Sequence, residues 1–214
     1  MILDDVITDV RRLLQDETTV YRYSDAFLLG LGNQALMRIA LMRPDLFSFV
    51  STVACTAGEV IQDAPSDSIR IIEVYSIVGG AGLVEVNREV LDQTIPTWPN
   101  DTAAAALNWM RHVRNPNKFF IYPQAPAAQS LDIEYSQSPP TYDGTTTITL
   151  LPDAYFPVVV DVIMFLAESA DNEHVTSGRA KLFQDSYIQA LGLTSRGRPV
   201  TDTETAGLED EEVV

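Results

Sequence analysis

The chain has 214 residues, and 46% are hydrophobic, which is enough for one domain with an insertion or for two small domains. Thirty acidic and 14 basic residues give a formal net charge of −16, which repels DNA phosphates and excludes an ordinary nucleic-acid-binding protein. The same charge would suit the wall of a conduit through which DNA slides without sticking. The single cysteine, Cys55, excludes an intramolecular disulfide and is expected to be a small buried hydrophobic residue in a strand.

A first helix is predicted over residues 2–15. Ile2, Val6 and Val10 recur there at helical spacing, with acidic residues between them. Residues 16–23 then form a connection rather than a continuation of the helix.

The second predicted helix, residues 24–43, has hydrophobic side chains on nearly every face. Ser24 can cap its first turn, and Pro44 ends it. A helix at the surface of a small domain needs only one hydrophobic stripe, and Gly30 and Gly32 weaken this one further. Either its own bundle encloses this helix, or part of its surface packs on a neighbouring subunit.

A β-rich insert is predicted over residues 47–151. Strict alternation of hydrophobic and acidic residues predicts a strand at 130–136, and the same pattern predicts one at 145–150. Residues 68–77 predict a strand with a bulge where two isoleucines adjoin. Residues 115–126 predict a turn, a short strand and a proline-bounded exit.

Helical character returns after Pro152. The hydrophobic run to about Ala170 predicts a third helix, although its β-branched residues make a buried strand a real alternative. Residues 176–191 predict a fourth helix. From residue 194 the periodicity ends and acidic residues dominate, so this part is expected to be disordered unless a basic partner orders it.

The predicted fold class is therefore α+β. It consists of an antiparallel bundle of about four helices, interrupted by a β-rich insert and followed by an extended acidic C-terminal tail. The expected parts are the discontinuous bundle, residues 1–46 and 152–193, the insert, residues 47–151, and the tail, residues 194–214.

The sequence contains no pattern typical of an enzyme, a metal site or a bound cofactor. His112 and His174 have no metal-ligand spacing, and no phosphate-binding loop or nucleophile motif occurs. Trp98 and Trp109 could stack on a sugar or a base, although such residues more often anchor a core or an interface. A hydrolase with an unrecognised pair of carboxylates stays possible but has no support in the pattern.

Several segments follow one another in a known order. "ILDDVITDVRRLLQDE" and "YSDAFLLGLGNQALMRIALMRPDLF" open the chain, "VNREVLDQTIPTW", "NPNKFFIYPQAP" and "LDIEYSQSPP" follow, and "LLPDAYFPVVVDVIMFLAESAD" leads into the last helix. Together they resemble tailed-phage head-to-tail adaptor proteins, including the tubular tail proteins of short-tailed phages, over residues 2–193. The opening pattern is carried by Arg12, Leu14, Asp16, Ser24, Asp25, Leu28, Asn33, Gln34, Arg43, Pro44, Asp45 and Phe47.

The resemblance implies a virion structural protein of the neck or tail, assembled in the host cytoplasm, and not an enzyme. Such adaptors form a ring, commonly of twelve copies, around the DNA channel beneath the portal protein. One surface grips the portal, and the opposite surface receives the tail nozzle or tube. Genomic DNA would pass through the lumen without sequence-specific binding, and no membrane would be involved.

The resemblance also suggests which surfaces make contacts. For the subunit interface we choose the two most hydrophobic helices, through Phe27, Leu31, Met37, Met42, Phe156 and Phe165. For portal docking we choose the tail, through Arg196, Arg198, Leu208, Val213 and Val214. The insert would face the tail. The alternative is a tail-associated module that binds a receptor or a glycan through the insert, with Trp98, Trp109 and the tyrosines as platforms.

Overall fold

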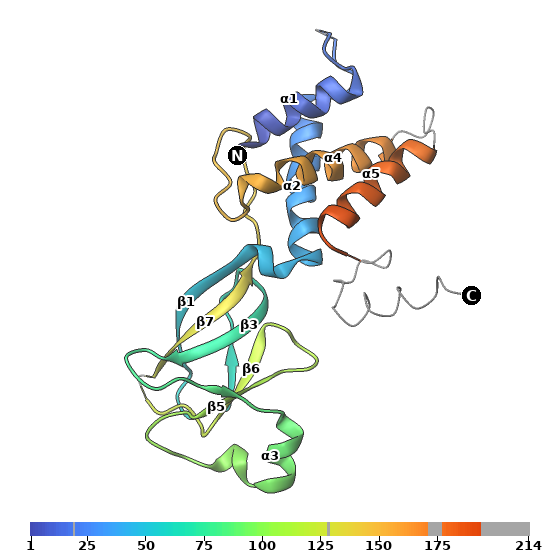
Figure 1. Ribbon diagram of the computed structural model, residues 1–214. Coiled ribbons are helices and arrows are strands. Elements are labelled where there is room, and N and C mark those ends of the chain that lie inside the picture. Colours follow the sequence, from blue (N-terminus) through green and yellow to red (C-terminus); the bar gives the residue numbers. More distant parts are fainter. Residues whose placement is uncertain (19, 128, 171–176, 194–214) are drawn as a thin grey trace, which may run out of the picture. The chain divides into compact units, whose positions relative to one another are not determined.

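The computed structural model describes residues 1–18, 20–127, 129–170 and 177–193 (Figure 1). The chain divides into two compact units, Met1–Arg43 with Pro139–Val214, and Pro44–Ser138. We call the first the helical unit and the second the β unit. The described residues contain five α-helices and two sheets, which confirms the predicted α+β class.

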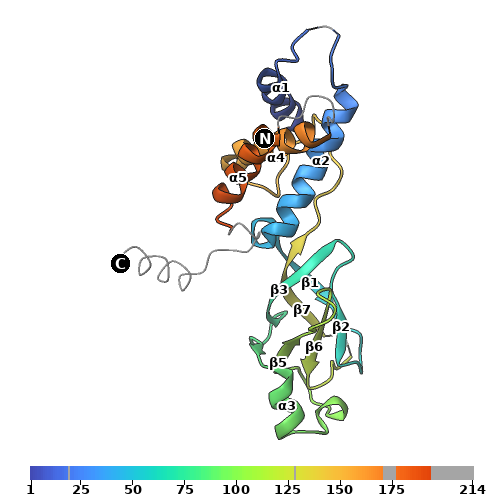
Figure 2. The same cartoon turned by 90° about the vertical axis from the view of Figure 1, so that its right-hand side faces the viewer.

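The helical unit contains four helices that lie close to their predicted positions. The third is a helix rather than a strand, and a short 3-10 turn, η3 (Asp153–Tyr155), leads into it. In both views α2 crosses α4 at a steep angle, while α5 packs along α4 (Figures 1 and 2). Their bounds are α1 (Leu3–Leu14), α2 (Asp25–Met42), α4 (Phe156–Ala170) and α5 (Ser177–Ala190).

The most enclosed helix is α4, which contacts α1, α2 and α5. Its buried residues occupy most of its circumference, as expected of a helix surrounded by others. They are Val158, Val159, Val160, Val162, Ile163, Met164, Leu166 and Ala167. The contacts with α1 and α4 also bury much of α2, which accounts within one chain for most of its hydrophobic character.

Gly32 lies where Leu3 of α1 packs against α2. A Cβ atom at this position would lie 3.0 Å from Leu3 Cδ2, which is tighter than ordinary van der Waals contact. Gly30 is different, because no atom of the described chain lies within 4 Å of the position its Cβ would occupy. The packing of α1 on α2 therefore explains why residue 32 is a glycine, but it does not explain Gly30.

Residues 139–151, which the sequence assigns to the insert, make their contacts in the helical unit. The Asn33 side chain donates to Tyr142 O (3.0 Å) and accepts from Tyr142 N (2.7 Å). Asp4 N donates to Gly144 O (3.0 Å), and Ile148 N donates to Met1 O (2.9 Å). The predicted strand at 145–150 is wrong, because this backbone bonds to the start of the chain instead of pairing with a strand.

A tight turn stands at the start of that segment. The Asp143 carboxylate accepts from the backbone N–H of Thr146 (2.9 Å) and from that of Thr145 (3.1 Å). These bonds, with the Thr146 N–H first, lower the pKa of Asp143, because they stabilise its ionised form. The turn uses the backbone N–H groups of Thr145 and Thr146, which are therefore not free to pair with a strand.

The β unit contains a three-stranded and a four-stranded sheet. In the first, β7 lies between β1 and β3 and is antiparallel to both, and a register shift between Ile71 and Glu73 confirms the predicted bulge. The second has the order β2-β6-β5-β4, with a parallel pair at β4. The strands are β1 (Ser48–Ala54), β2 (Ile61–Asp63), β3 (Ser68–Ile77), β4 (Val84–Glu85), β5 (Asn108–Arg111), β6 (Lys118–Tyr122) and β7 (Ser130–Gln137).

Two cores lie on opposite faces of the four-stranded sheet, because side chains alternate along its strands. On one face Trp109, Phe119 and Ile121 pack with residues of β3 and β7. On the other, Met110 and Phe120 pack with residues of α3 (Arg88–Thr94) and of a 3-10 turn, η2 (Trp98–Asn100). A further 3-10 turn, η1 (Pro44–Phe47), precedes β1.

Cys55 follows β1 directly and is half-buried against the core between the two sheets. Burial raises the pKa of its thiol to about 11, so the thiol stays protonated at neutral pH. Within the described residues, no helix is both long and hydrophobic enough to cross a lipid bilayer.

Candidate interaction surfaces

The connection between α1 and α2 is held by a buried ion pair. Arg11 Nη1 donates to Asp16 Oδ2 (3.0 Å), and Arg11 Nη2 donates to Tyr23 O (3.0 Å) and Asp25 Oδ1 (2.5 Å). Asp16 also accepts from two backbone N–H groups of the connection, at 2.8 and 3.1 Å. Both partners of the Arg11–Asp16 pair are buried and well supplied with hydrogen bonds. We call this arrangement the Arg11 clamp.

Other positions of the opening pattern have similar structural roles. Ser24 caps α2 by accepting from the backbone N–H of its first turn at 3.2 Å. Asn33 bonds residues 139–151, which we call the return segment, to α2. Arg43 donates to the backbone carbonyl of Leu191 after α5, and Phe47 is fully buried. Several residues of the pattern that resembles phage adaptors therefore stabilise the fold, most of them in the helical unit and Phe47 in the β unit.

The α2 residues chosen for the subunit interface differ in how much surface they expose. Leu31 is only 6% exposed, because its own chain already covers it. Phe27 is 39% exposed and stacks on Tyr23, with ring centroids 5.6 Å apart. Met37 and Met42 are half-buried. Phe27 therefore offers the largest free hydrophobic surface of these four.

The α4 residues chosen for the interface are both half-buried. Phe165 lies against Tyr187 of α5, with ring centroids 5.8 Å apart. Phe156 lines a hollow of about 390 Å³ between α1 and α4, beside Leu13, which is 47% exposed. We call it the α1–α4 hollow, and its lining is Asp9, Arg12, Leu13, Phe156, Pro157, Val160 and Asp161.

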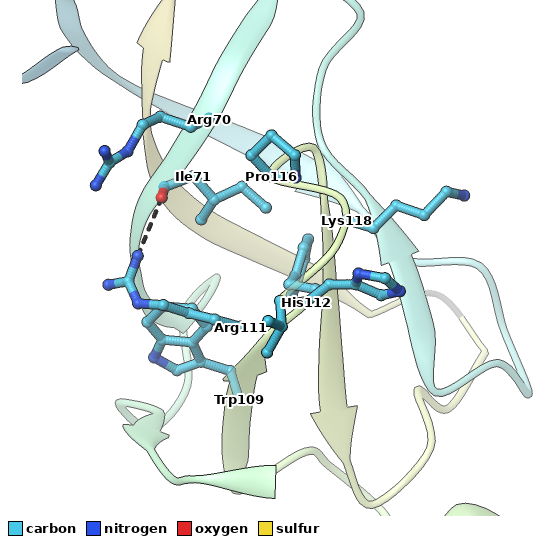
Figure 3. Close-up of a pocket in the computed structure, with 9 residues that line it drawn as sticks. Arg70, Ile71, Trp109, Arg111, His112, Pro116 and Lys118 are labelled. Carbon is cyan, nitrogen blue, oxygen red and sulfur yellow. Dashed lines mark hydrogen bonds between the residues drawn. The ribbon is translucent and has the colours of Figure 1, made fainter. Parts of the chain in front are cut away.

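All five Lys and Arg residues of the β unit gather around the turn between β5 and β6. They line two hollows of about 320 and 370 Å³ that share Arg111, His112 and Val113, and Figure 3 shows the first of them. We call the two together the basic hollow. The five residues are Arg70, Arg88, Arg111, Arg114 and Lys118.

The turn itself is fixed to the edge of β3. The backbone N–H of Ile71 donates to Pro116 O (3.1 Å). Arg111 reaches the same edge, with Nη1 donating to Ile71 O (3.2 Å) and Nη2 to Ile72 O (2.6 Å), as Figure 3 shows for Ile71. Arg111 Nε also lies 2.7 Å from Glu85 Oε1. Arg111 is thus a structural link between the two sheets as well as part of the lining.

Two of the other bases also have carboxylate partners. Lys118 Nζ lies 2.5 Å from Asp63, and Arg88 Nε lies 3.3 Å from Asp92. Arg70 and Arg114 are exposed, and neither forms an ion pair with any residue that the structure describes. The basic hollow therefore presents two cations that its own surroundings do not neutralise.

His112 adds a neutral hydrogen-bond donor. Its Nδ1 accepts from the backbone N–H of Asn115 (3.0 Å), so the neutral ring carries its proton on Nε2. The ring stacks on Phe120, with centroids 5.2 Å apart. Val113, next along the turn, is 97% exposed.

The basic hollow was not predicted from the sequence, although the sequence contains a signal for it. Residues 111–118 contain three bases and a histidine, in a chain whose net charge is −16. A local charge count would have identified that run. The fold was needed to add Arg70 and Arg88, which come from distant parts of the chain.

Some of the candidate residues lie outside the described part of the chain. These are His174 and the portal-docking residues Arg196, Arg198, Leu208, Val213 and Val214. Within residues 1–18, 20–127, 129–170 and 177–193, no three His, Cys, Asp or Glu side chains come together in a group that could hold a metal ion.

Residues of the pattern that resembles head-to-tail adaptors make the contacts described above. They form the Arg11 clamp, cap α2 and bond the return segment to α2. The family described as SU10 adaptor protein matches residues 1–206. The chain therefore belongs to this family, which is a family of phage head-to-tail adaptors, and is a bacteriophage structural component. The match reaches residue 206, beyond the segments quoted from the sequence. A search of curated proteins gives no match.

Proposed function

We propose that this chain forms a ring of twelve copies beneath the portal, where it extends the DNA channel and provides the platform for the tail nozzle or tube. Membership of the SU10 adaptor protein family supports this role, since the family implies portal and tail partners. The observation that carries the proposal is this whole-chain match, together with the hydrophobic surface that the helical unit leaves open. The protein would assemble in the host cytoplasm and end in the neck of the virion.

A closed ring needs two different faces on every subunit, because its contacts are heterologous. We assign one face to α2, where Phe27 is exposed and Met37 and Met42 are half-buried. The other face is the α1–α4 hollow with Phe156. Leu31 and Phe165 would support the two faces from within the subunit.

The C-terminal tail, residues 194–214, would dock on the portal. Arg196 and Arg198 would pair with acidic portal groups, and Leu208, Val213 and Val214 would enter hydrophobic sites there. A segment of this composition gains order on binding, since alone it buries too little hydrophobic surface. The β unit would face the tail. The antiparallel packing of four helices as one bundle, and an extended tail, remain predictions.

The net charge of −16 supports the channel role. A wall of this charge would keep genomic DNA moving, because phosphates find few cations to bind. The alternative of a glycan- or receptor-binding module relied on Trp98, Trp109 and the tyrosines as platforms. Trp98 and Trp109 are both buried, which counts against the tryptophans in that role, whereas Tyr75 is 41% exposed.

Mixing the purified chain with portal rings tests the proposal. Electron microscopy should show added density as a ring on one end of the portal. A variant lacking residues 194–214 should fail to attach while its circular dichroism stays unchanged. A full-length chain that stays unattached at a large excess over portal would contradict the proposal, and a truncated chain that saturates the portal would contradict the role of the tail.

A further inference from the structure

The basic hollow stands out because the unit that carries it is acidic. Residues 44–138 contain eleven acidic and five basic residues, a net charge of −6, and yet all five bases line this one region. Bases gathered at one place on an acidic unit create a local field that attracts anionic groups. The hollow is therefore a candidate site for an anionic partner.

The free donors of the hollow suit carboxylates. Arg70 and Arg114 are exposed and have no ion-pair partner among the described residues. An arginine presents several N–H donors that match the two oxygens of a carboxylate. His112 can add a donor through Nε2, since its Nδ1 is already occupied by a backbone N–H.

The lining also contains hydrophobic surface. Ile71, Trp109, Val113, Pro116 and Phe119 line the same part of the basic hollow. Val113 is 97% exposed and adds hydrophobic surface at the edge of this lining. A partner that fits this surface carries hydrophobic side chains as well as acidic ones.

An acidic peptide with hydrophobic side chains fits these features better than DNA does. Duplex DNA is a stiff rod with closely spaced phosphates, and it needs a row of free cations. Of the five bases of the basic hollow, Arg70 and Arg114 are the two that lack a carboxylate partner among the described residues, whereas Arg88, Arg111 and Lys118 each have one. A peptide can place one or two carboxylates beside them without bringing a continuous charged backbone close to an acidic unit.

The chain itself contains such a peptide. Residues 202–214 contain six acidic residues and no base, and hydrophobic Leu208, Val213 and Val214 lie among or after them. The sequence after Leu193 has 21 residues and can span up to roughly 70 Å when extended. That reach exceeds the size of a typical small domain, so the segment can contact another copy.

We propose that the basic hollow binds the acidic C-terminal segment, residues 202–214, of a neighbouring copy of this chain. Arg70 and Arg114 pair with its carboxylates, and Val113 contacts its hydrophobic residues. The contact needs no portal and goes beyond the proposed function. Because the same segment is proposed to dock on the portal, the hollow and the portal compete for it, and portal binding releases it.

Photocrosslinking of the full-length protein tests the inference without the portal. Val113 is replaced by p-benzoylphenylalanine, and isotopically heavy and light copies are mixed at low salt and irradiated. Mass spectrometry should find position 113 joined to residues 202–214 in heavy–light pairs. The Arg70→Gln/Arg114→Gln variant should reduce this yield by roughly tenfold, since it removes both free charges. The matched Arg38→Gln/Lys181→Gln variant, which loses the same charge from exposed positions of the helical unit, should keep it.

Three outcomes would overturn the inference. These are crosslinks that never reach residues 202–214, crosslinks that join only copies of the same isotope, and a yield that the arginine double variant leaves unchanged. Binding of a fluorescent DNA duplex that the same double variant abolishes, without tail crosslinks, would assign the hollow to phosphate backbones instead. Failure here leaves portal docking untouched, since portal docking is measured with portal rings.

Discussion

Replacing Asp16 by alanine breaks the Arg11 clamp and should destabilise the helical unit strongly. The substitution removes the acceptor for Arg11 Nη1 and for two backbone N–H groups of the connection. It leaves a buried guanidinium with Tyr23 O and Asp25 as its remaining partners. Breaking a buried ion pair from one side costs about 3–5 kcal/mol, and the remaining partners favour the lower end, about 3 kcal/mol.

A loss of about 3 kcal/mol is a large share of the stability of an ordinary domain. The unfolding midpoint of the helical unit should therefore fall by at least about 10 °C, and its urea midpoint should fall with it. Far-ultraviolet circular dichroism monitors the unfolding of the helical unit, because this unit contains most of the helical residues that the structure describes.

Asp9→Ala is the matched control, because it also removes one carboxylate from an ion pair with an α1 arginine, the exposed pair with Arg12 at 2.8 Å. A surface pair of this kind contributes less than about 1 kcal/mol. If the Asp16→Ala variant has an unfolding midpoint as high as that of the Asp9→Ala variant, the reasoning is refuted. Arg11→Met/Asp16→Leu should recover part of the loss, since it leaves no unpaired buried charge.

Three further predictions follow from the helical unit. Gly30→Ala should stabilise α2 by about 1 kcal/mol, while Gly32→Ala should gain less because its Cβ would crowd Leu3, and urea unfolding of both variants measures the order. The turn bonds that lower the pKa of Asp143 should contribute stability that is complete above the ordinary carboxyl pKa and is lost as the pH falls through the lowered one, so Asp143→Asn should flatten the acid limb of the stability curve. Phe156→Ser should abolish ring assembly on the portal, as seen by electron microscopy, and should lower the free energy of unfolding by no more than about 2 kcal/mol, because Phe156 is only half-buried.

Each of these predictions has a result that would count against it. A larger gain from Gly32→Ala than from Gly30→Ala would show that Leu3 does not set the helix spacing. An Asp143→Asn curve that parallels the wild-type curve in acid would remove the role of the turn. Leu182→Ser is the control for Phe156→Ser, because Leu182 is 70% exposed on α5 and lies outside the α1–α4 hollow, and equal losses in both variants would argue against a specific interface.

The helices could be predicted from the sequence because their signals are local. Ser24 and Pro44 mark the ends of α2, and hydrophobic spacing marks the faces. The short helix α3 was missed, although Asn87 caps it by accepting from Glu89 N at 2.9 Å and Leu91 is buried. Seven residues are too few for a helical period to stand out.

The return segment and the basic hollow could not be predicted, because both depend on contacts between distant residues. Residues 145–150 alternate like a strand, but Ile148 N donates to Met1 O, and the nearby Tyr142 is bonded to Asn33 of α2. Arg70 joins residues 111–118 through the packing of β3 on the other sheet, and Arg88 joins them through the packing of α3. The subunit interface is harder still, since exposure in one chain identifies available surface without identifying its partner.

The most direct test of the central claim is electron cryo-microscopy of the neck of the mature virion. We predict twelve copies of this chain in a ring directly beneath the portal, with α2 of each copy against the α1–α4 hollow of the next and DNA in the lumen. A virion in which this chain forms no ring around the DNA channel, or lies away from the portal, would contradict the account.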